Sequence, residues 1–456
     1  MAQKPSIPKG TRDFSPAEVA KRNYIFGKIK SQFKNFGFQP IETPSFENSD
    51  TLMGKYGEEG DRLIFKILNS GDFLKKADEK TLQQKDSLKL TPSISEKALR
   101  YDLTVPFARY VVQHQNEIDF PFKRYQIQPV WRADRPQKGR FREFFQCDAD
   151  VVGSRSLWQE VEFVQLYDAV FNSLGLEGVT IKINNRKVLS GFAEVIEEQD
   201  KLIDFTVALD KLDKIGEEGV KKEMREKGIA ESALDKIQPI FNLKGGFGEK
   251  IQGIKDILVT SEVGKAGIAE LEFIEKAVAE IPLKSASLEL DVTLARGLNY
   301  YTGAIFEVSA PDGVKMGSIG GGGRYDDLTG IFGLKDMSGV GISFGLDRIF
   351  LVLEELGLFP ETITENTKAL FINFGDEEAL YALKAISELR RKNIVAELYP
   401  DAAKMNKQMK YANKREIPFV VLAGGEEMQQ EKFTLKNMKT GEQYRVSTAE
   451  LLEKIR

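Results

Sequence analysis

Apolar positions early in the chain recur at near-helical spacing and predict a long amphipathic helix. They are Val19, Ile25, Ile29 and Phe33. The residues just before them favour a helix start, because Ser15 is a good N-cap, Pro16 suits the first turn and Glu18 stands at the capping-box position. A strand pattern at residues 39–43 follows and ends at Pro44. The chain is therefore expected to open with a helix and a short strand.

The clearest strand pattern lies at residues 122–146. An apolar and aromatic run ends at Trp131, a basic polar turn continues through Gly139, and an apolar run resumes at residues 141–146. We expect two antiparallel strands joined by a charged loop.

Other segments fill in the pattern around this hairpin. Strands are predicted at residues 61–67, 100–106, 179–183 and 288–294, and an amphipathic helix at residues 154–173. The polar residues 69–89 are expected to form a loop or a flexible insertion. Residues 189–280 are rich in Lys and Glu, with helical spacing and without strong strands, which indicates an inserted helical segment.

The last third begins with a glycine-rich stretch at residues 317–330 and an apolar strand that contains Gly341 and Gly345 and leads into a helix carrying Arg348. Residues 359–367 are rich in Pro, Thr and Asn and are predicted to be a linker. Beyond them, within residues 368–456, the strand-like runs KALFINFG, VAELYP and IPFVVLAG alternate with helices expected from Glu377 and Asp401, which is typical of a small parallel α/β domain.

Composition limits the chemistry that is available. The 456 residues suffice for two or three domains, and the net charge of −4 gives no overall attraction to nucleic acid. No apolar run of about 18 residues and no apolar signal core at the start are present, so a cytoplasmic protein without membrane spans is expected. A single cysteine, Cys147, and a single histidine, His114, argue against disulfides, cysteine-rich zinc sites and histidine-based relays.

The loop of the central hairpin is dense in guanidinium groups. They belong to Arg132, Arg135, Arg140 and Arg142, and Phe144 and Phe145 follow directly. Because arginine grips phosphate in a bidentate manner and an aromatic ring can stack on a base, these residues indicate a site for a nucleotide polyphosphate. A solvated basic hairpin is the alternative. Acidic residues alternate with the arginines and favour a zwitterionic substrate beside the phosphates; they are Asp134, Glu143, Asp148 and Asp150.

Two further segments suggest ligand contacts. Asp102 and Thr104 lie two residues apart, so on a strand they would share a face and could hold an ammonium group; a strand-end cap is the equally plausible alternative. The glycine-rich residues 317–330 lack the Gly-Lys-Ser/Thr ending of a P-loop and the spacing of a dinucleotide fingerprint. Their consecutive glycines allow backbone to approach a ligand closely.

Several of these segments resemble histidyl-tRNA synthetases, a family of class II aminoacyl-tRNA synthetases. WRADRP followed by GRFREFFQ resembles motif 2, SGVGISFGLDRI resembles motif 3, and the opening helix and strand resemble motif 1, which forms the dimer interface in that class. ARGLNYYTG and RYDLTVP resemble segments specific to the histidine enzymes. Residues 368–456 resemble the anticodon-binding domain shared by histidyl, prolyl, threonyl and glycyl synthetases.

The resemblance implies a fold and a domain plan. We expect an α+β catalytic domain with a class II antiparallel sheet and helices at residues 1–188 and 281–358. A helical insertion at residues 189–280, close to the tRNA acceptor arm or only a solvated cap, and a C-terminal α/β anticodon-binding domain would complete the chain. The resemblance also implies a homodimer.

Residue roles follow from the same resemblance. Arg132 and Arg296 would be catalytic, neutralising charge on the α-phosphate of ATP. The implied histidine-binding residues are Asp102, Leu103, Thr104, Gln146, Asp150, Arg296, Tyr300 and Tyr301. The implied ATP-binding residues are Arg132, Asp134, Arg140, Phe144 and Arg348. Two positions depart from the family pattern, because Asn299 replaces an Asp and Asp134 replaces a longer Glu.

Contacts with tRNA are expected at the hairpin loop and in the C-terminal domain. The candidates are Gln137, Lys138, Arg142, Lys404, Lys407, Lys410 and Lys414. The last four recur every three or four positions and so line one face of a helix, where they would meet phosphates or simply be solvated.

The implied reaction has two steps. The carboxylate of histidine attacks the α-phosphorus of ATP, which gives histidyl-adenylate and pyrophosphate, and a terminal ribose hydroxyl of tRNA(His) then takes the histidyl group. Mg²⁺ is expected with the triphosphate, with ligands that the sequence does not assign. The main alternative is a synthetase-like, histidine-binding regulatory subunit of histidine biosynthesis. A synthetase for another amino acid is disfavoured by the segment at residues 296–302.

Overall fold

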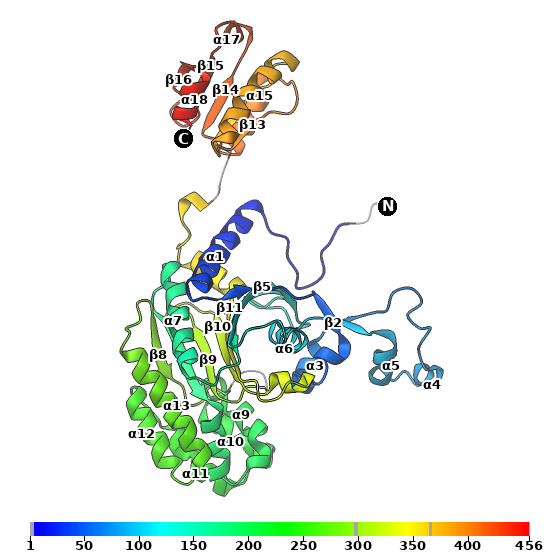
Figure 1. The fold of residues 1–456 in the computed structure, drawn as a ribbon, viewed down its shortest axis with the longest axis vertical. Coiled ribbons are helices and arrows are strands. Elements are labelled where there is room, and N and C mark those ends of the chain that lie inside the picture. Colours follow the sequence, from blue (N-terminus) through cyan, green and yellow to red (C-terminus); the bar gives the residue numbers. More distant parts are fainter. Residues whose placement is uncertain (1–3, 296–299, 364–366, 456) are drawn as a thin grey trace. The chain divides into compact units, whose positions relative to one another are not determined.

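The computed structural model describes residues 4–295, 300–363 and 367–455, and it divides the chain into two compact units, residues 1–359 and 360–456 (Figure 1). Each unit has hydrophobic core clusters of its own. No helix among the described residues is long and apolar enough to cross a membrane.

The first unit is built on an eight-stranded sheet in the order β1-β5-β6-β11-β10-β9-β7-β8. The strands are β1 Gln39–Pro40, β5 Phe122–Trp131, β6 Glu143–Val152, β7 Val179–Asn185, β8 Ala286–Leu290, β9 Ala304–Ser309, β10 Gly320–Tyr325 and β11 Gly339–Gly345. Only the two outermost pairs, β1 with β5 and β7 with β8, are parallel. The predicted antiparallel sheet and the predicted hairpin, now β5 and β6, are confirmed.

Helices α1 Pro16–Asn35, α7 Trp158–Ser173 and α14 Leu346–Glu355 pack against this sheet. The predicted capping box of α1 is present, with Ser15 and Glu18 in reciprocal hydrogen bonds. Ile25, Ile29 and Phe33 are fully buried as predicted, whereas Val19 is 42% exposed. In the first turns of α1 the buried side chain is Arg22 and not Val19. Its burial is possible because its guanidinium pairs with the buried carboxylate of Asp347.

The predicted helical insertion consists of helices, and their buried faces continue the core of the sheet. They are α8 Arg186–Val195, α9 Leu202–Leu209, α10 Leu212–Glu226, α11 Glu231–Phe241, α12 Phe247–Ile257 and α13 Glu262–Ala279. Helix α8 directly follows β7, and α13 leads back to β8, so the insertion occupies the crossover between two parallel strands.

The segment before β5 differs from the strand predictions. Residues 61–67 contain the end of helix α3 Gly57–Leu63 and only a two-residue strand, β3 Lys66–Ile67. Strand β4 Lys97–Leu99 ends before Asp102, and helix α6 Thr104–Gln113 begins at Thr104, so the predicted strand at residues 100–106 is wrong. With β2 Phe46–Asn48, these strands form a small sheet in the order β2-β4-β3.

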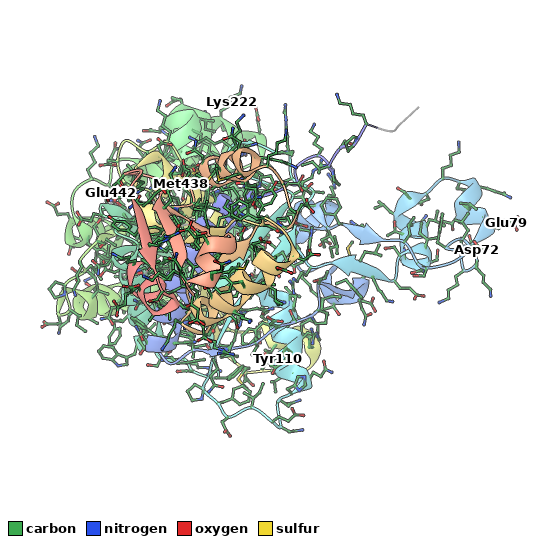
Figure 2. All side chains as sticks on the ribbon, turned by 90° about the horizontal axis from the view of Figure 1, so that it is seen from above. Asp72, Glu79, Tyr110, Lys222, Met438 and Glu442 are labelled. Carbon is green, nitrogen blue, oxygen red and sulfur yellow. The ribbon has the colours of Figure 1, made fainter. Side chains whose placement is uncertain are left out.

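Residues 69–89 are not a plain loop. They hold α4 Glu79–Gln83 and the start of α5 Ser87–Ile94, and each helix is capped by an aspartate, Asp78 or Asp86. Figure 2 shows Asp72 and Glu79 at the end of an extension away from the sheet.

The second unit has a five-stranded sheet in the order β13-β12-β14-β15-β16. Its strands are β12 Ala369–Phe371, β13 Ala396–Leu398, β14 Phe419–Leu422, β15 Phe433–Asn437 and β16 Gln443–Val446, and its longer helices are α15 Asp376–Arg391, α16 Met405–Lys414 and α18 Thr448–Lys454. The three strands that the sequence predicted, β12, β13 and β14, are parallel as expected, and two further strands that it did not predict, β15 and β16, extend the sheet in antiparallel pairs. The connection from β14 to β15 holds only the five-residue helix α17 Gly425–Gln429, and a parallel crossover needs a dozen residues or more.

Candidate active site

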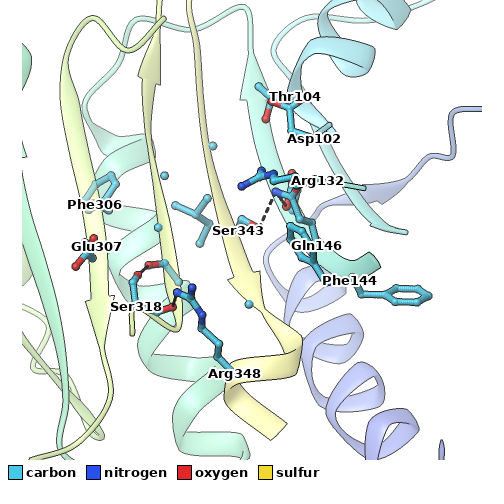
Figure 3. Close-up of a pocket in the computed structure, with 18 of the residues that line it drawn as sticks. Asp102, Thr104, Arg132, Phe144, Gln146, Phe306, Glu307, Ser318, Ser343 and Arg348 are labelled. Atoms are coloured by element: carbon cyan, nitrogen blue, oxygen red, sulfur yellow. Dashed lines mark hydrogen bonds between the residues drawn. The ribbon is translucent and has the colours of Figure 1, made fainter. Parts of the chain in front are cut away.

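A cavity of about 340 Å³ opens over the middle of the eight-stranded sheet. Side chains from β6, β9, β10 and β11 form its floor, and the segments around Asp102 and Arg140 form its walls. Figure 3 shows Asp102 and Thr104 at one end of this cavity and Arg348 with Ser318 at the other, with Arg132 and Gln146 between them. Because the cavity is lined by carboxylates as well as guanidinium groups, a ligand that carries both positive and negative charge fits it.

Asp102 lies at one end of the cavity (Figure 3) and is almost fully buried. The Tyr56 hydroxyl donates to it at 2.8 Å, the Tyr300 hydroxyl at 3.3 Å and the Val105 backbone N–H at 3.2 Å. Burial raises the pKa of the Asp102 carboxyl, while the hydrogen bond from Tyr56 and the charge of Arg132 act in the opposite direction. The contact with Val105 means that Asp102 also caps the start of α6.

Asp150 lies deeper and pairs with the fully buried guanidinium of Arg124 at 2.9 Å. The hydroxyl of Tyr325 donates to Asp150 at 2.6 Å. Burial raises the pKa of Asp150, and the charge of Arg124 opposes that shift. Position 341 of β11, which pairs with Asp150 in the sheet, must be glycine, because a Cβ there would lie 2.0 Å from Oδ1 of Asp150.

Asp148 also lines the cavity and is 2% exposed. Burial raises its pKa to about 7, while Arg124 opposes the shift and Asp150 adds to it. The sequence analysis counted Asp148 among the acidic residues that favour a zwitterionic substrate but did not include it in the predicted histidine-binding set. The alternation of side chains along strand β6 could have indicated that Asp148 faces the site. Every second residue shares one face, and those at this face line the cavity: Phe144, Gln146, Asp148 and Asp150.

Three guanidinium groups line the cavity, those of Arg132, Arg140 and Arg348. The Arg132 Nε donates to the Tyr101 carbonyl at 3.0 Å, and its guanidinium lies 5.2 Å from the centre of the Phe144 ring. Arg348, in the first turn of α14, donates from Nε to the Gly139 carbonyl at 3.0 Å. Both guanidinium groups line the cavity, where arginine can bind an anion through charge-assisted hydrogen bonds.

The comparisons with known proteins agree with this geometry. The family model for histidyl-tRNA synthetase matches residues 68–349, and the model for the anticodon-binding domain matches residues 368–456. The histidine–tRNA ligase of Christiangramia forsetii is 83% identical over 443 residues, which cover 97% of each chain. The chain belongs to the histidyl-tRNA synthetase family.

More distant members of the synthetase family agree as well. The histidine–tRNA ligase of Flavobacterium johnsoniae is 71% identical and covers 98% of each chain. The crystal structure of histidyl-tRNA synthetase from Nostoc sp. PCC 7120 superposes with a TM-score of 0.79 at 31% identity, over 100% of this chain and 99% of that one. The predicted class II fold, with a catalytic sheet and an anticodon-binding domain, is confirmed.

The structure brings most of the predicted synthetase site residues together. Those that line the cavity are Asp102, Thr104, Arg132, Asp134, Arg140, Phe144, Gln146, Asp150, Tyr300, Tyr301 and Arg348. Leu103 is fully buried and does not line it. Arg296 and Asn299 lie outside the described residues. Cavity residues without a predicted role include Asp148, Glu307, Ser318, Tyr325, Ser343 and Asp347.

The predicted tRNA-binding residues lie elsewhere. Gln137 and Lys138 are exposed in the hairpin loop. Arg142 instead holds the N-terminal segment, since its backbone N–H donates to the Gly10 carbonyl at 2.9 Å. The lysines at 404, 407, 410 and 414 are all exposed in the second unit, and Lys404 is the residue before α16 rather than part of it.

Within the described ranges, no group of three or more His, Cys, Asp or Glu side chains forms a site that could hold a metal ion alone. A Mg²⁺ ion that arrives with a triphosphate usually keeps several waters and takes only one or two carboxylates from the protein. Asp134, beside Arg140 at 4.0 Å, and Glu307 are carboxylates in the cavity lining. These two carboxylates fit a metal that is delivered by the nucleotide.

Proposed function

We propose that this protein is a histidine–tRNA ligase that forms histidyl-adenylate from histidine and ATP and then transfers histidine to tRNA. One observation carries the assignment: one cavity on the class II sheet holds the buried carboxylate of Asp102 at one end, Arg348 at the other and Arg132 between them (Figure 3). An amino acid and a nucleotide triphosphate placed in it would lie side by side, with the reacting carboxylate and α-phosphate between. The 83% identity to a histidine–tRNA ligase supports a ligase over a regulatory subunit.

The end of the cavity at Asp102 would hold histidine. Its α-ammonium group would meet Asp102 and Thr104, because a buried carboxylate that already accepts two phenolic hydrogen bonds is held in a fixed orientation. The imidazole would then extend toward Gln146, Asp150 and Tyr301, where a carboxylate and a phenol can each take one ring nitrogen. Leu103 would contribute to this end through its backbone only, since its side chain is buried in the core.

The guanidinium groups would hold ATP. Arg132 would neutralise charge that develops on the α-phosphate, and Arg140 and Arg348 would hold the β- and γ-phosphates. Phe144 would stack on adenine, with Asp134 near the ribose or the metal. Arg296 would be a second guanidinium at the α-phosphate, a role that rests on the family motif alone. Mg²⁺ would reduce the charge on the triphosphate, with Asp134 or Glu307 as the nearest protein carboxylates.

The remaining partners follow from the activity. The tRNA acceptor end would approach the cavity past Gln137 and Lys138, and the exposed lysines before and on α16 would meet phosphates of the anticodon arm. A homodimer through the segment of α1 and β1 is expected for a class II enzyme. A ligase that charges tRNA works in the cytoplasm, where translation takes place.

The decisive experiment is pyrophosphate exchange into ATP, with each of the twenty amino acids offered in turn. We expect exchange with histidine alone. Arg132→Ala should lower the exchange rate by about 10²-fold or more, because an oriented charge at the reacting phosphate would be lost. If histidine binds but no amino acid supports exchange, the protein is a histidine-binding regulator and not a ligase.

A further inference from the structure

Asp148 is a buried carboxylate in the cavity whose neighbours come from three strands. In the sheet register it stands between Gln126 of β5 and Ser343 of β11. The Gln146 side-chain amide lies within hydrogen-bonding distance of both Asp148, at 3.5 Å, and Ser343, at 3.4 Å. The other side-chain atom of that amide, the oxygen Oε1, is buried and has no hydrogen-bond partner among the described residues. This polar cluster is therefore incomplete until a ligand brings a donor.

The charges of the described residues around Asp148 do not balance. Asp150 on its own strand and Asp102 on the opposite wall are acidic. Of the described cations, Arg124 of β5 acts on Asp148 and Arg132 acts on Asp102. Cys147 and Tyr167 are buried, Tyr301 is half-buried, and burial raises the pKa of all three, so they add no charge near neutral pH. Two described guanidinium groups thus face three carboxylates.

We propose that Asp148 is a further substrate-binding residue of this site, which holds a proton in the free enzyme and gives it to solvent when the ammonium group of the amino acid enters. The proposal rests on the histidine–tRNA ligase function and adds a residue and a proton to it. No bond other than the O–H bond of Asp148 breaks, and the released proton goes to water. The ionised carboxylate then balances the new ammonium charge.

Asp148 is expected to hold a proton in the free enzyme because several charged groups share a small buried volume. Among the described residues, three ionised carboxylates with two guanidinium groups leave an excess negative charge, so protonation of one of them stabilises the empty site. Phenols hold the other two carboxylates in their ionised form, since Tyr325 donates to Asp150 and Tyr56 and Tyr300 donate to Asp102. The side-chain hydrogen bond that favours ionised Asp148 comes instead from Ser343. An incoming ammonium supplies the missing positive charge, which removes the reason to keep the proton.

The sign of the pH dependence follows by linkage. The pKa of Asp148 is about 7 in the ligand-free protein and should be lower in the complex, because an opposite charge favours the ionised form. Binding therefore releases a proton, and affinity for the amino acid rises with pH until Asp148 is ionised in the free enzyme as well. Each unit by which ligand lowers the pKa weakens binding about tenfold at low pH relative to high pH.

The test uses a histidine analogue whose ring is not protonated in the range studied, β-(1,2,4-triazol-3-yl)-L-alanine, so that only protein groups titrate. Dissociation constants and proton release are measured by calorimetry in buffers of different ionisation enthalpy, from about pH 5.5 to about pH 8.5. For the full-length native protein we expect proton release near pH 7 and binding that weakens about tenfold toward the acid end. In Asp148→Asn both effects should disappear, and the ATP KM should not change.

A matched control is Asp204→Asn, which removes an exposed carboxylate that pairs with Lys227 far from the cavity. It should behave like the native protein. Absence of proton release on analogue binding by the native protein would overturn the proposal, and this measurement needs no variant to fold. An unchanged pH profile in Asp148→Asn would do the same. Failure of the native protein to catalyse histidine-dependent exchange at pH 8 is a different result, which would remove the ligase function itself.

Discussion

Asp102 shows at the scale of single residues how this site is assembled. Two phenols from distant parts of the sequence donate hydrogen bonds to its carboxylate. They are Tyr56, just before α3, and Tyr300, shortly before β9. Tyr56 is itself held, because its ring packs 4.6 Å from the ring of Tyr101. No local pattern in the sequence singles out Tyr56, and its hydrogen bond makes it a positioning residue for Asp102.

Tyr56→Phe should therefore raise the KM for histidine and leave the KM for ATP unchanged. The lost hydrogen bond to a carboxylate is worth about 1.5 kcal/mol or more, which corresponds to roughly tenfold in KM. Because this bond lowers the pKa of Asp102, its removal raises that pKa, and the defect should grow as the pH falls. Pyrophosphate exchange at several pH values measures both effects.

Tyr381→Phe is the matched control, since that hydroxyl donates to the Lys432 carbonyl in the second unit. It should change neither KM. An equal rise of the histidine and ATP KM values in Tyr56→Phe would mean that Tyr56 only supports the fold of this region.

At the scale of elements, the N-terminal segment before α1 ties two active-site segments together. The guanidinium of Arg12 lies 3.3 Å from the centre of the Phe141 ring in the hairpin loop and pairs with Asp347 of α14 at 2.6 Å. Arg22 of α1 pairs with the same carboxylate oxygen at 2.5 Å. Asp347 directly precedes Arg348, so this cluster fixes the first turn of α14 relative to the hairpin loop.

Arg12→Ala should weaken ATP binding and have little effect on histidine. We expect the KM for ATP to rise about fivefold, from the loss of about 1 kcal/mol in a partly buried, charge-assisted contact. Lys21→Ala is the control, because Lys21 also joins α1 to α14, by an ion pair with Glu354 that is largely exposed and away from the cavity. Initial-rate measurements with ATP as the varied substrate give both KM values. An equal KM for ATP in the two variants would contradict this account.

At the scale of the whole molecule, the two units have separate hydrophobic cores. Residues of the sheet and the inserted helices form one core, and residues such as Phe371, Leu389 and Leu435 form another in the second unit. All residues that line the cavity belong to the first unit. Formation of histidyl-adenylate should therefore require only residues 1–359.

A chain that ends at Phe359 should fold and keep histidine-dependent pyrophosphate exchange within a few-fold of the full chain. Its charging of tRNA(His) should fall far more, because the anticodon-binding domain would be missing. Parallel exchange and aminoacylation assays measure the difference. Equal loss in both assays, with an intact thermal transition, would show that the second unit also supports the first reaction step.

Local patterns were enough to predict the capped helix α1, the β5–β6 hairpin and the helical insertion. These depend on residue type and spacing within a short window. The prediction of a strand at residues 61–67 was wrong because it also used only a short window. A short apolar run does not distinguish a strand from the end of a helix such as α3. The antiparallel β15–β16 hairpin was missed because strand direction depends on the length of the connections.

The sequence by itself determined the chemistry of this protein: guanidinium groups and aromatic rings on a hairpin, carboxylates at alternate positions along β6, and motifs of a histidyl-tRNA synthetase. Only the tertiary structure decided which of these groups meet. The pairing of Arg124 with Asp150 needs the strand register, and the contacts of Asp102 with Tyr56 and Tyr300 join residues 46 and 198 positions apart. The titration of Asp148 depends on burial among such neighbours, and burial is a property of the folded chain.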